Sequence, residues 1–186
     1  GDRVLDPENE LVIKRVIHTT ADFDYADNLT FSDHAVQKGI AALKSGCDIV
    51  TDTQMAKAGI NKTILASLGG EVHCFMSDPD VAQEARSRGV TRAFVSMEKA
   101  AALEKPCIFA IGNAPTALLS LEQLMEEGKA TPALIIGVPV GFVNVEISKE
   151  RIIEKARAPY IVARGRKGGS NVAAAICNAL LYQIKR

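Results

Sequence analysis

The sequence predicts an α/β protein, a three-layer α/β/α sandwich with a mainly parallel five-stranded sheet. Five short apolar runs, separated by stretches of helical periodicity, carry this prediction. Apolar runs without polar alternation are typical of parallel strands buried on both faces, and right-handed crossovers then place helices on each side. No linker, repeat or low-complexity tract divides the 186 residues, so we expect a single domain over residues 1–186.

The five predicted strands are short and rich in apolar or β-branched residues. They are Cys47–Thr51, Glu71–Met76, Cys107–Ile111, Ala133–Gly137 and the run from Pro159 to Ala163. Ligands of such sheets bind beyond the carboxyl ends of the strands. We therefore expect the functional residues just after these runs.

The predicted helices fill the intervals between the strands. The first begins at Asp6-Pro7, a pair suited to the N-cap and first helical position, and ends near Thr19. The others cover about Ser32 to Lys44, a short segment ending near Gly59, Pro79 to Arg88, Thr91 to Leu103, Pro115 to Gly128, Val140 onward, and the Ala-rich segment after Ser170.

Composition excludes several classes of partner. Lys and Arg balance Asp and Glu at 22 each, so a nucleic-acid-binding surface is not expected. No apolar run approaches the ~20 residues that a membrane span needs. The four cysteines are far apart and include no CxxC pair, which favours reduced thiols in a cytoplasmic protein.

A glycine-rich loop with three cations follows the last predicted strand. It reads Arg164-Gly165-Arg166-Lys167-Gly168-Gly169-Ser170 and opens the final helix. Glycines allow close backbone approach, and a helix N-terminus with Arg and Lys favours an anion. The spacing fits neither nucleotide-binding glycine motif, so we interpret the loop as a site for a carboxylate-rich ligand. The alternative is an ordinary strand-to-helix turn with solvated cations.

Polar residues also follow two other predicted strands. Asp52 and Thr53 come after the run at 47–51, and Asn113 and Thr116 after the run at 107–111. Asp52 could orient a catalytic base or cap the next helix, and capping is the favoured interpretation. The other three are candidate pocket residues because they follow the carboxyl ends of predicted strands.

His18 is the strongest candidate for catalysis. It falls in the last turn of the first predicted helix, where the helix dipole favours a cation. Asp22 or Asp24 would add to this effect if either folded back onto the ring. A protonated imidazole suits a general acid, and the alternative is a surface histidine that caps the helix.

The remaining histidines are weaker candidates. His34 is expected at the surface, and His73 is expected as a hydrogen-bonded core or edge residue within a strand. A zinc site built from His18, His73 and the cysteines lacks a recognised spacing, so no metal site is predicted. No GxSxG elbow of a serine hydrolase is present.

Arg92 follows Thr91 at the start of a predicted helix, where the helix dipole does not help a cation. Its guanidinium could clamp a carboxylate, or it could be solvated.

Five blocks of sequence, taken together, resemble the precorrin-8X methylmutase family of cobalamin biosynthesis, including its cobalt-precorrin-8 branch. The similarity runs from about Asp6 to the C-terminus. The most specific blocks are GNAPTAL at 112–118 and GRKGGS at 165–170. The others are Ile17–Phe23, Thr51–Met55 with Gly59-Ile60, and Gly137–Val143 with Glu146 and Ser148-Lys149.

The resemblance implies a homodimeric α/β isomerase that needs no added cofactor. Its substrate is a tetrapyrrole with many carboxylates, precorrin-8x or cobalt-precorrin-8. A methyl group moves from ring carbon eleven to ring carbon twelve, giving hydrogenobyrinate or its cobalt counterpart. The family's catalytic histidine corresponds to His18, and its pocket Thr-Arg pair corresponds to Thr91-Arg92. Arg164, Arg166, Lys167 and Gly168 are candidate contacts to substrate carboxylates.

Two alternatives remain at this point. Family members usually begin with a further segment, containing a Ser-Phe pair, that helps to cover the substrate, and this sequence begins after that point. A tetrapyrrole carrier or scaffold without catalysis is therefore one alternative. The other is a nucleotide-dependent α/β enzyme that uses the glycine loop for phosphate.

Overall fold

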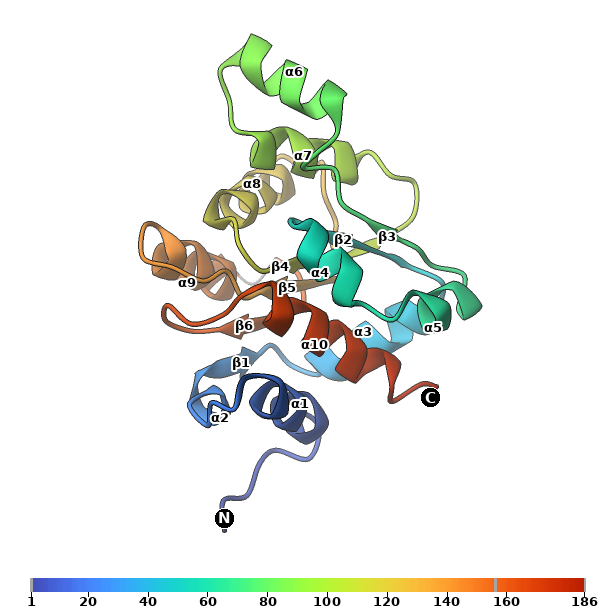
Figure 1. Ribbon diagram of the computed structural model, residues 1–186, viewed down its shortest axis with the longest axis vertical. Coiled ribbons are helices and arrows are strands. Elements are labelled where there is room, and N and C mark those ends of the chain that lie inside the picture. Colours follow the sequence, from blue (N-terminus) through green and yellow to red (C-terminus); the bar gives the residue numbers. More distant parts are fainter. Residues whose placement is uncertain (1, 156, 186) are drawn as a thin grey trace.

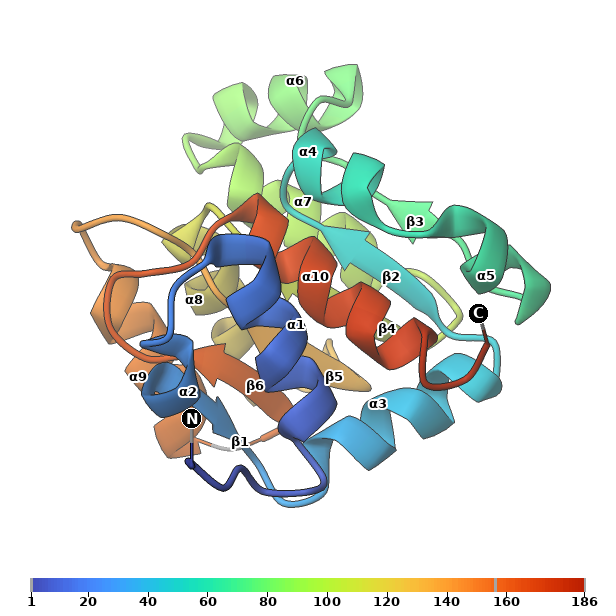
Figure 2. The same cartoon turned by 60° about the horizontal axis from the view of Figure 1, so that its bottom comes forward.

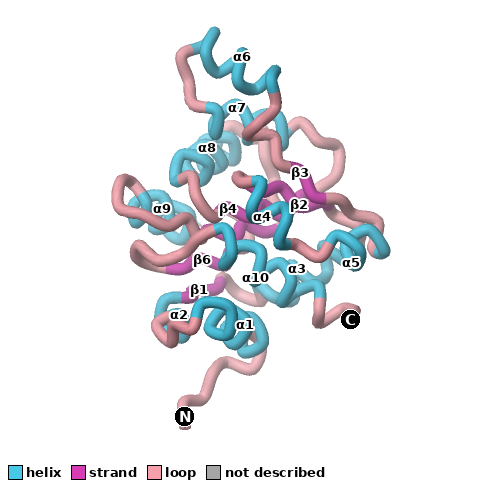
Figure 3. The backbone as a smooth tube through the Cα atoms, in the orientation of Figure 1, coloured by secondary structure: helices cyan, strands magenta, loops and turns pink. Residues whose placement is uncertain are grey.

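The computed structural model describes residues 2–155 and 157–185, which form a six-stranded sheet with helices on both faces (Figures 1 and 3). The strands are β1 Leu29–Phe31, β2 Asp48–Thr51, β3 Val72–His73, β4 Cys107–Ile111, β5 Leu134–Gly137 and β6 Tyr160–Ala163. Their order is β1-β6-β5-β4-β2-β3, and only β1 is antiparallel to its neighbour.

The helices alternate with the strands along most of the chain. They are α1 Glu10–Thr20, α2 Tyr25–Asn28, α3 Ala35–Lys44, α4 Gln54–Gly59, α5 Lys62–Ser67, α6 Pro79–Arg88, α7 Arg92–Ala101, α8 Pro115–Glu126, α9 Val145–Lys155 and α10 Ser170–Leu181. None of those in the described part of the chain combines the length and apolar content that crossing a bilayer requires.

Two apolar cores, one on each face of the sheet, establish the three layers. Side chains of β4 alternate between them: Ile108 and Ala110 face the core with α1, α3 and α10, and Phe109 and Ile111 face the core with α7, α8 and α9. Both faces of the strand are apolar, which explains its unbroken apolar run. Helix α6 lies outside this arrangement and packs on α7 (Figure 1).

The predicted fold class is confirmed, but the sheet has one more strand than expected. Strand β1 has only three residues and lies antiparallel at the edge, where Leu29 pairs with Ala163. Such a short segment gives no periodic signal, so the sequence did not reveal it. The predicted strand at 71–76 is reduced to Val72–His73 at the opposite edge of the sheet.

Two predicted helix starts were too early. Asp6 and Pro7 precede α1, and the Asp6 carboxylate accepts a hydrogen bond from the Glu8 N–H at 2.9 Å in a turn. Helix α9 begins at Val145 rather than near Val140. Asn144, with φ of 61°, is in the left-handed region just before it, so the preceding chain forms a loop.

Candidate active site

The carboxyl ends of the parallel strands meet around one buried carboxylate. Asp52 follows β2 and is 2% exposed. Its oxygens accept hydrogen bonds from the N–H groups of Gly112, Asn113 and Ala114, at 2.9, 2.9 and 2.6 Å. Burial raises the pKa of this carboxyl despite the three donors. Asp52 therefore fixes the loop between β4 and α8.

The expected capping role of Asp52 falls instead to its neighbour. Thr53 Oγ1 accepts a hydrogen bond from Ala56 N–H at 3.0 Å and caps α4. The same hydroxyl lies 2.7 Å from Ser170 Oγ, at the start of α10. Thr53 thus links two helix starts, and Asn113 contributes its N–H to Asp52 while its side chain is exposed.

Two glycines allow the strand-end loops to pack without space between them. A Cβ on Gly112 would lie 2.8 Å from Gly169 O, and one on Gly168 would lie 2.0 Å from Val138 O. Both distances are shorter than real contacts to backbone allow. The loops after β4, β5 and β6 are therefore held against one another and against the start of α10.

The three cations of the glycine loop are each paired with an acidic side chain. Arg164 donates two hydrogen bonds to Glu150, at 3.0 and 2.9 Å. Lys167 Nζ lies 2.7 Å from carboxylate oxygens of both Asp22 and Asp24. Arg166 lies 3.7 Å from Glu146 and its guanidinium stacks over the Phe142 ring. All three cations remain about half exposed, so a ligand can reach them.

The pairing of Lys167 corrects the expectation for Asp22 and Asp24. Neither carboxylate folds back onto His18, because both bind Lys167. The hydrogen bonds that Lys167 donates to the Asp22 and Asp24 carboxylates raise the pKa of Lys167. The bonds that Asp22 accepts from Lys167 and from the Asp24 N–H lower the pKa of Asp22. The result is a clasp, formed by Asp22, Asp24 and Lys167, that joins the segment after α1 to the glycine loop.

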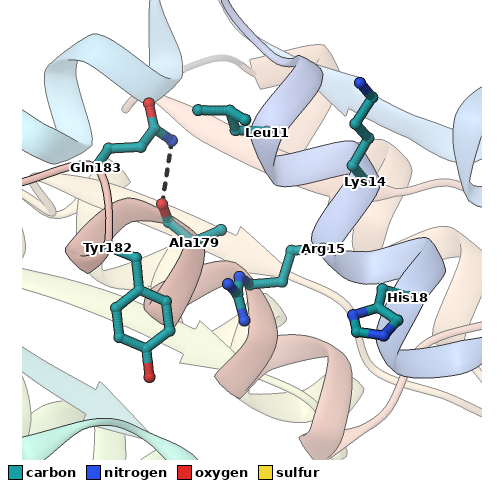
Figure 4. Close-up of a pocket in the computed structure, with 7 residues that line it drawn as sticks. All are labelled: Leu11, Lys14, Arg15, His18, Ala179, Tyr182 and Gln183. Carbon is teal, nitrogen blue, oxygen red and sulfur yellow. Dashed lines mark hydrogen bonds between the residues drawn. The ribbon is translucent and has the colours of Figure 1, made fainter. Parts of the chain in front are cut away.

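His18 lies on the exposed face of α1 and lines a pocket of about 310 Å³ between α1 and α10 (Figure 4). Lys14 and Arg15 line the pocket from the same helix, and Tyr182 lines it from the chain just after α10. Arg15 reaches across it, with Cζ 4.6 Å from the centre of the Tyr182 ring. The pocket therefore has three basic side chains in its lining, of which Lys14 is paired with Glu10 at 2.7 Å.

Arg15 and Tyr182 are pocket residues that the sequence did not predict, although a signal for Arg15 was present. Leu11, Lys14, Arg15 and His18 are spaced by three or four residues, which puts them on one face of a helix. That spacing predicts that Arg15 accompanies His18. Tyr182 could not be found in the same way, because the packing of α1 beside α10 joins the two ends of the chain (Figure 2).

The Thr91-Arg92 pair lies in another part of the molecule. Thr91 Oγ1 caps α7 by accepting from Phe94 N–H at 3.1 Å, and Arg92 is exposed in the first turn. Thr91 and Thr116 line a pocket of about 440 Å³ between α7 and α8. Helix α7 lies in the upper part of Figure 1 and α1 in the lower part, and the pocket at Thr91 shares no lining residue with the pocket at His18.

The other histidines behave as expected. His34 is exposed, with Nδ1 2.8 Å from Glu8 Oε1. His73 lies on edge strand β3, with Nε2 3.0 Å from Asp48 and 3.3 Å from Glu71. These three side chains have ligand atoms close enough to hold a metal ion. However, Lys105 already places its ammonium 3.3 Å from the Asp48 carboxylate, at the amino-terminal edge of the sheet.

Comparison with known proteins settles the family. The family model described as precorrin-8X methylmutase matches residues 1–183. The cobalt-precorrin-8 methylmutase of Salmonella typhimurium is 50% identical over 184 residues, which cover 98% of this chain and 85% of that protein. The chain belongs to the precorrin-8X methylmutase family. It is thus an isomerase of cobalamin biosynthesis, and this prediction from the sequence is confirmed.

Further relatives agree with this membership. The precorrin-8X methylmutase of Pseudomonas aeruginosa is 40% identical over 172 residues, which cover 92% of this chain and 82% of that protein. The solved structure of precorrin-8x methyl mutase from Thermus thermophilus superposes with a TM-score of 0.87 at 39% identity, covering 98% of this chain and 89% of that one. The methylmutase fold is therefore shared across nearly the whole chain.

Proposed function

We propose that this methylmutase binds precorrin-8x or cobalt-precorrin-8 along the carboxyl edge of its sheet and moves a methyl group from ring carbon eleven to ring carbon twelve. The observation that carries the proposal is the position of His18 in the last turn of α1, the end of that helix that is tied to the glycine loop at the carboxyl edge. There an exposed imidazole stands among basic side chains, and the Asp22–Lys167–Asp24 clasp joins its helix to the glycine loop. A polyanionic pigment matches this distribution of charge in an otherwise neutral chain.

His18 is proposed as the general acid. Imidazole exchanges protons readily near neutral pH, and a positioned acid contributes about 10²–10⁴-fold to a rate. Protonation of a ring nitrogen draws electron density from the adjoining carbon. The bond from the methyl group to carbon eleven then breaks as its bond to carbon twelve forms. Because the reaction is an isomerisation, the proton that the substrate gains is lost again from the product.

The substrate's acidic side chains are proposed to bind the cations of the strand-end loops. A substrate carboxylate that reaches Arg164, Arg166 or Lys167 would take the place of a carboxylate of the protein, and until then these ion pairs keep the loop ordered. Gly168 and Thr53 shape this surface. Asp52 and Asn113 support this surface through the hydrogen bond that the Asn113 N–H donates to the Asp52 carboxylate. In this proposal the Asp52 carboxylate does not bind the substrate.

The Thr91-Arg92 pair is proposed to bind the same ligand from a second copy of the chain. His18 and Thr91 line separate pockets of the single chain, whereas a homodimer could bring both pockets to one pigment. Phe142 and Val143 support an interface near the loop, since they are 78% and 80% exposed. A molecular mass measured by light scattering would test the dimer.

The cytoplasm is the proposed location of the protein. The four free cysteines, all buried, suit a reducing compartment of this kind.

The acid role is tested by His18→Ala, with His34→Ala as the matched control. Conversion of precorrin-8x, with and without cobalt, is followed by absorption spectroscopy. We expect His18→Ala to lose about 10²–10⁴-fold in kcat and to bind the tetrapyrrole within a few-fold of wild type. His34→Ala should keep full activity. Wild-type turnover by His18→Ala would refute the acid role, and pigment binding by wild type without any product would identify a carrier.

A further inference from the structure

A lysine that the reaction does not use directly is buried completely beneath the glycine loop. Lys149, on α9, is 0% exposed, although most lysines keep their ammonium group in water. Burial lowers its pKa to about 8, while Glu146 on the same helix acts in the opposite direction. A side chain so costly to bury needs compensating contacts.

Those contacts are two carbonyl groups of the glycine loop. Lys149 Nζ donates hydrogen bonds to Gly165 O at 2.8 Å and to Lys167 O at 2.9 Å. The carbonyl between them, that of Arg166, accepts from Gly141 N–H at 3.1 Å. Three successive carbonyl groups are therefore held, two by the buried Lys149 ammonium and one by the backbone of the loop before α9.

This anchoring of the backbone determines which side chains of the loop are exposed to solvent. With their carbonyl groups held in this way, Arg166 and Lys167 keep side chains that are 60% and 46% exposed. Gly165 has φ of 90°, a conformation that glycine adopts without strain and that lets the chain turn above the ammonium group. The acidic partners of the cations lie on other segments and hold only the side chains.

We propose that Lys149 is a positioning residue, which holds the backbone of residues 164–168 in the shape that presents Arg164, Arg166 and Lys167 to the carboxylates of the substrate. This inference rests on the proposed function, in which the loop binds the tetrapyrrole. Lys149 itself does not touch the substrate. A neutral side chain of similar length would fill the same space and leave the two carbonyl groups without a donor.

The test compares Lys149→Met with Lys155→Met, which changes an exposed lysine on the same helix. The first measurement is limited trypsin digestion, because trypsin cleaves after Arg164, Arg166 and Lys167 only when the loop can unfold locally. The second is steady-state turnover of precorrin-8x. We expect Lys149→Met to be cut in the loop about 10-fold faster than wild type or Lys155→Met. Its KM should rise about 10-fold while kcat changes less than about threefold.

The outcomes separate the two proposals. Cleavage and KM equal to those of Lys155→Met would overturn the role of Lys149, and so would faster cleavage with an unchanged KM, which would make the lysine a purely structural anchor. If Lys149→Met does not fold, Lys149→Gln retains one amide donor and is measured in the same way. A wild-type protein that neither bound nor converted the tetrapyrrole would refute the proposed function, and digestion would still report whether Lys149 holds the loop.

Discussion

The two ends of strand β2 carry aspartates whose carboxylates find different hydrogen-bond donors, mostly side chains at the amino end and only backbone N–H groups at the carboxyl end. At the amino end, Asp48 bonds to His73 at 3.0 Å and Lys105 at 3.3 Å, as well as to the Glu71 N–H. At the carboxyl end, Asp52 receives its hydrogen bonds from backbone N–H groups. Burial alone would raise both pKa values, but the donors around Asp48 outweigh it and lower the pKa there.

The difference in donors shows a division between the two edges of the sheet, one closed by ion pairs and the other open to a ligand. The amino edge is closed by charged side chains that neutralise each other. The carboxyl edge is shaped by buried charges bonded to backbone, Asp52 to N–H groups and Lys149 to carbonyl groups. Basic side chains there remain partly exposed and open to an anion. Four predictions test this division, beginning with the largest expected effect.

Asp52→Ala should destabilise the fold more than Asp48→Ala. Loss of the Asp52 carboxylate leaves three backbone donors without their acceptor in a closely packed region, which we expect to cost about 3–5 kcal/mol of unfolding free energy. Asp48→Ala should cost about 1–2 kcal/mol, because the half-exposed Lys105 side chain can turn its ammonium group to water. Urea unfolding of both variants decides the point. Equal losses would contradict the proposed difference between the edges.

Lys149 should make stability rise with pH between about 8 and 10.5. The folded pKa of about 8 is below the ordinary value of 10.5, so the unfolded chain binds more protons in this window and the folded state gains as pH rises. The full gain is about 3 kcal/mol. Buried thiols such as Cys47 and Cys107 act in the opposite direction, because burial raises their pKa values. The measured quantity is therefore the stability difference between wild type and Lys149→Met, and a flat difference would refute the shift.

Opening the clasp at Lys167 should strengthen substrate binding. Asp22→Asn with Asp24→Asn frees the ammonium for a substrate carboxylate, and we expect the Kd for the tetrapyrrole to fall about threefold to tenfold at low salt. Glu84→Gln, which changes an acid paired with Arg88 on α6, is the control. Weaker binding by the double variant would mean that the clasp supports the pocket rather than competing with the ligand.

The smallest effect is expected at the amino edge. Lys105→Met removes an ammonium group from a side chain that is half exposed, so the loss of stability should stay below about 1 kcal/mol. Turnover of precorrin-8x should equal that of wild type within error. A clear loss of activity would show that the amino edge also contributes to the reaction.

Much of the architecture follows from sequence patterns, and the exceptions have physical reasons. Strand β4 was predicted to the residue, because an apolar run lies between Pro106 and Gly112. Strand β1 was not, since its three residues are specified by pairing with β6 rather than by a local pattern. The pair Asp6-Pro7 has the chemistry of a helix start but forms a turn, because the apolar face of α1 begins later, at Val12.

The sequence predicted where in the sheet the candidate site lies, but it did not predict which residues contact one another there. Strand ends place Asp52, Thr53, Asn113 and the glycine loop at one edge, and the structure agrees with that placement. The partners of the loop cations were not predictable, because Asp22 and Glu150 come from segments that the topology alone brings together. The burial of Lys149 was not predictable either, since a lysine in a helix of polar and apolar residues ordinarily lies on the solvent-exposed face.

The packing of α1 on α10 has a consequence for biosynthesis of the chain. His18 is on α1, whereas Tyr182 and α10, which covers the apolar face of α1, come much later in the chain. Until they emerge from the ribosome, Val12 and Val16 have no cover from α10, and the pocket has one wall. The pocket at His18 therefore forms only after α10 has been synthesised and has packed on α1.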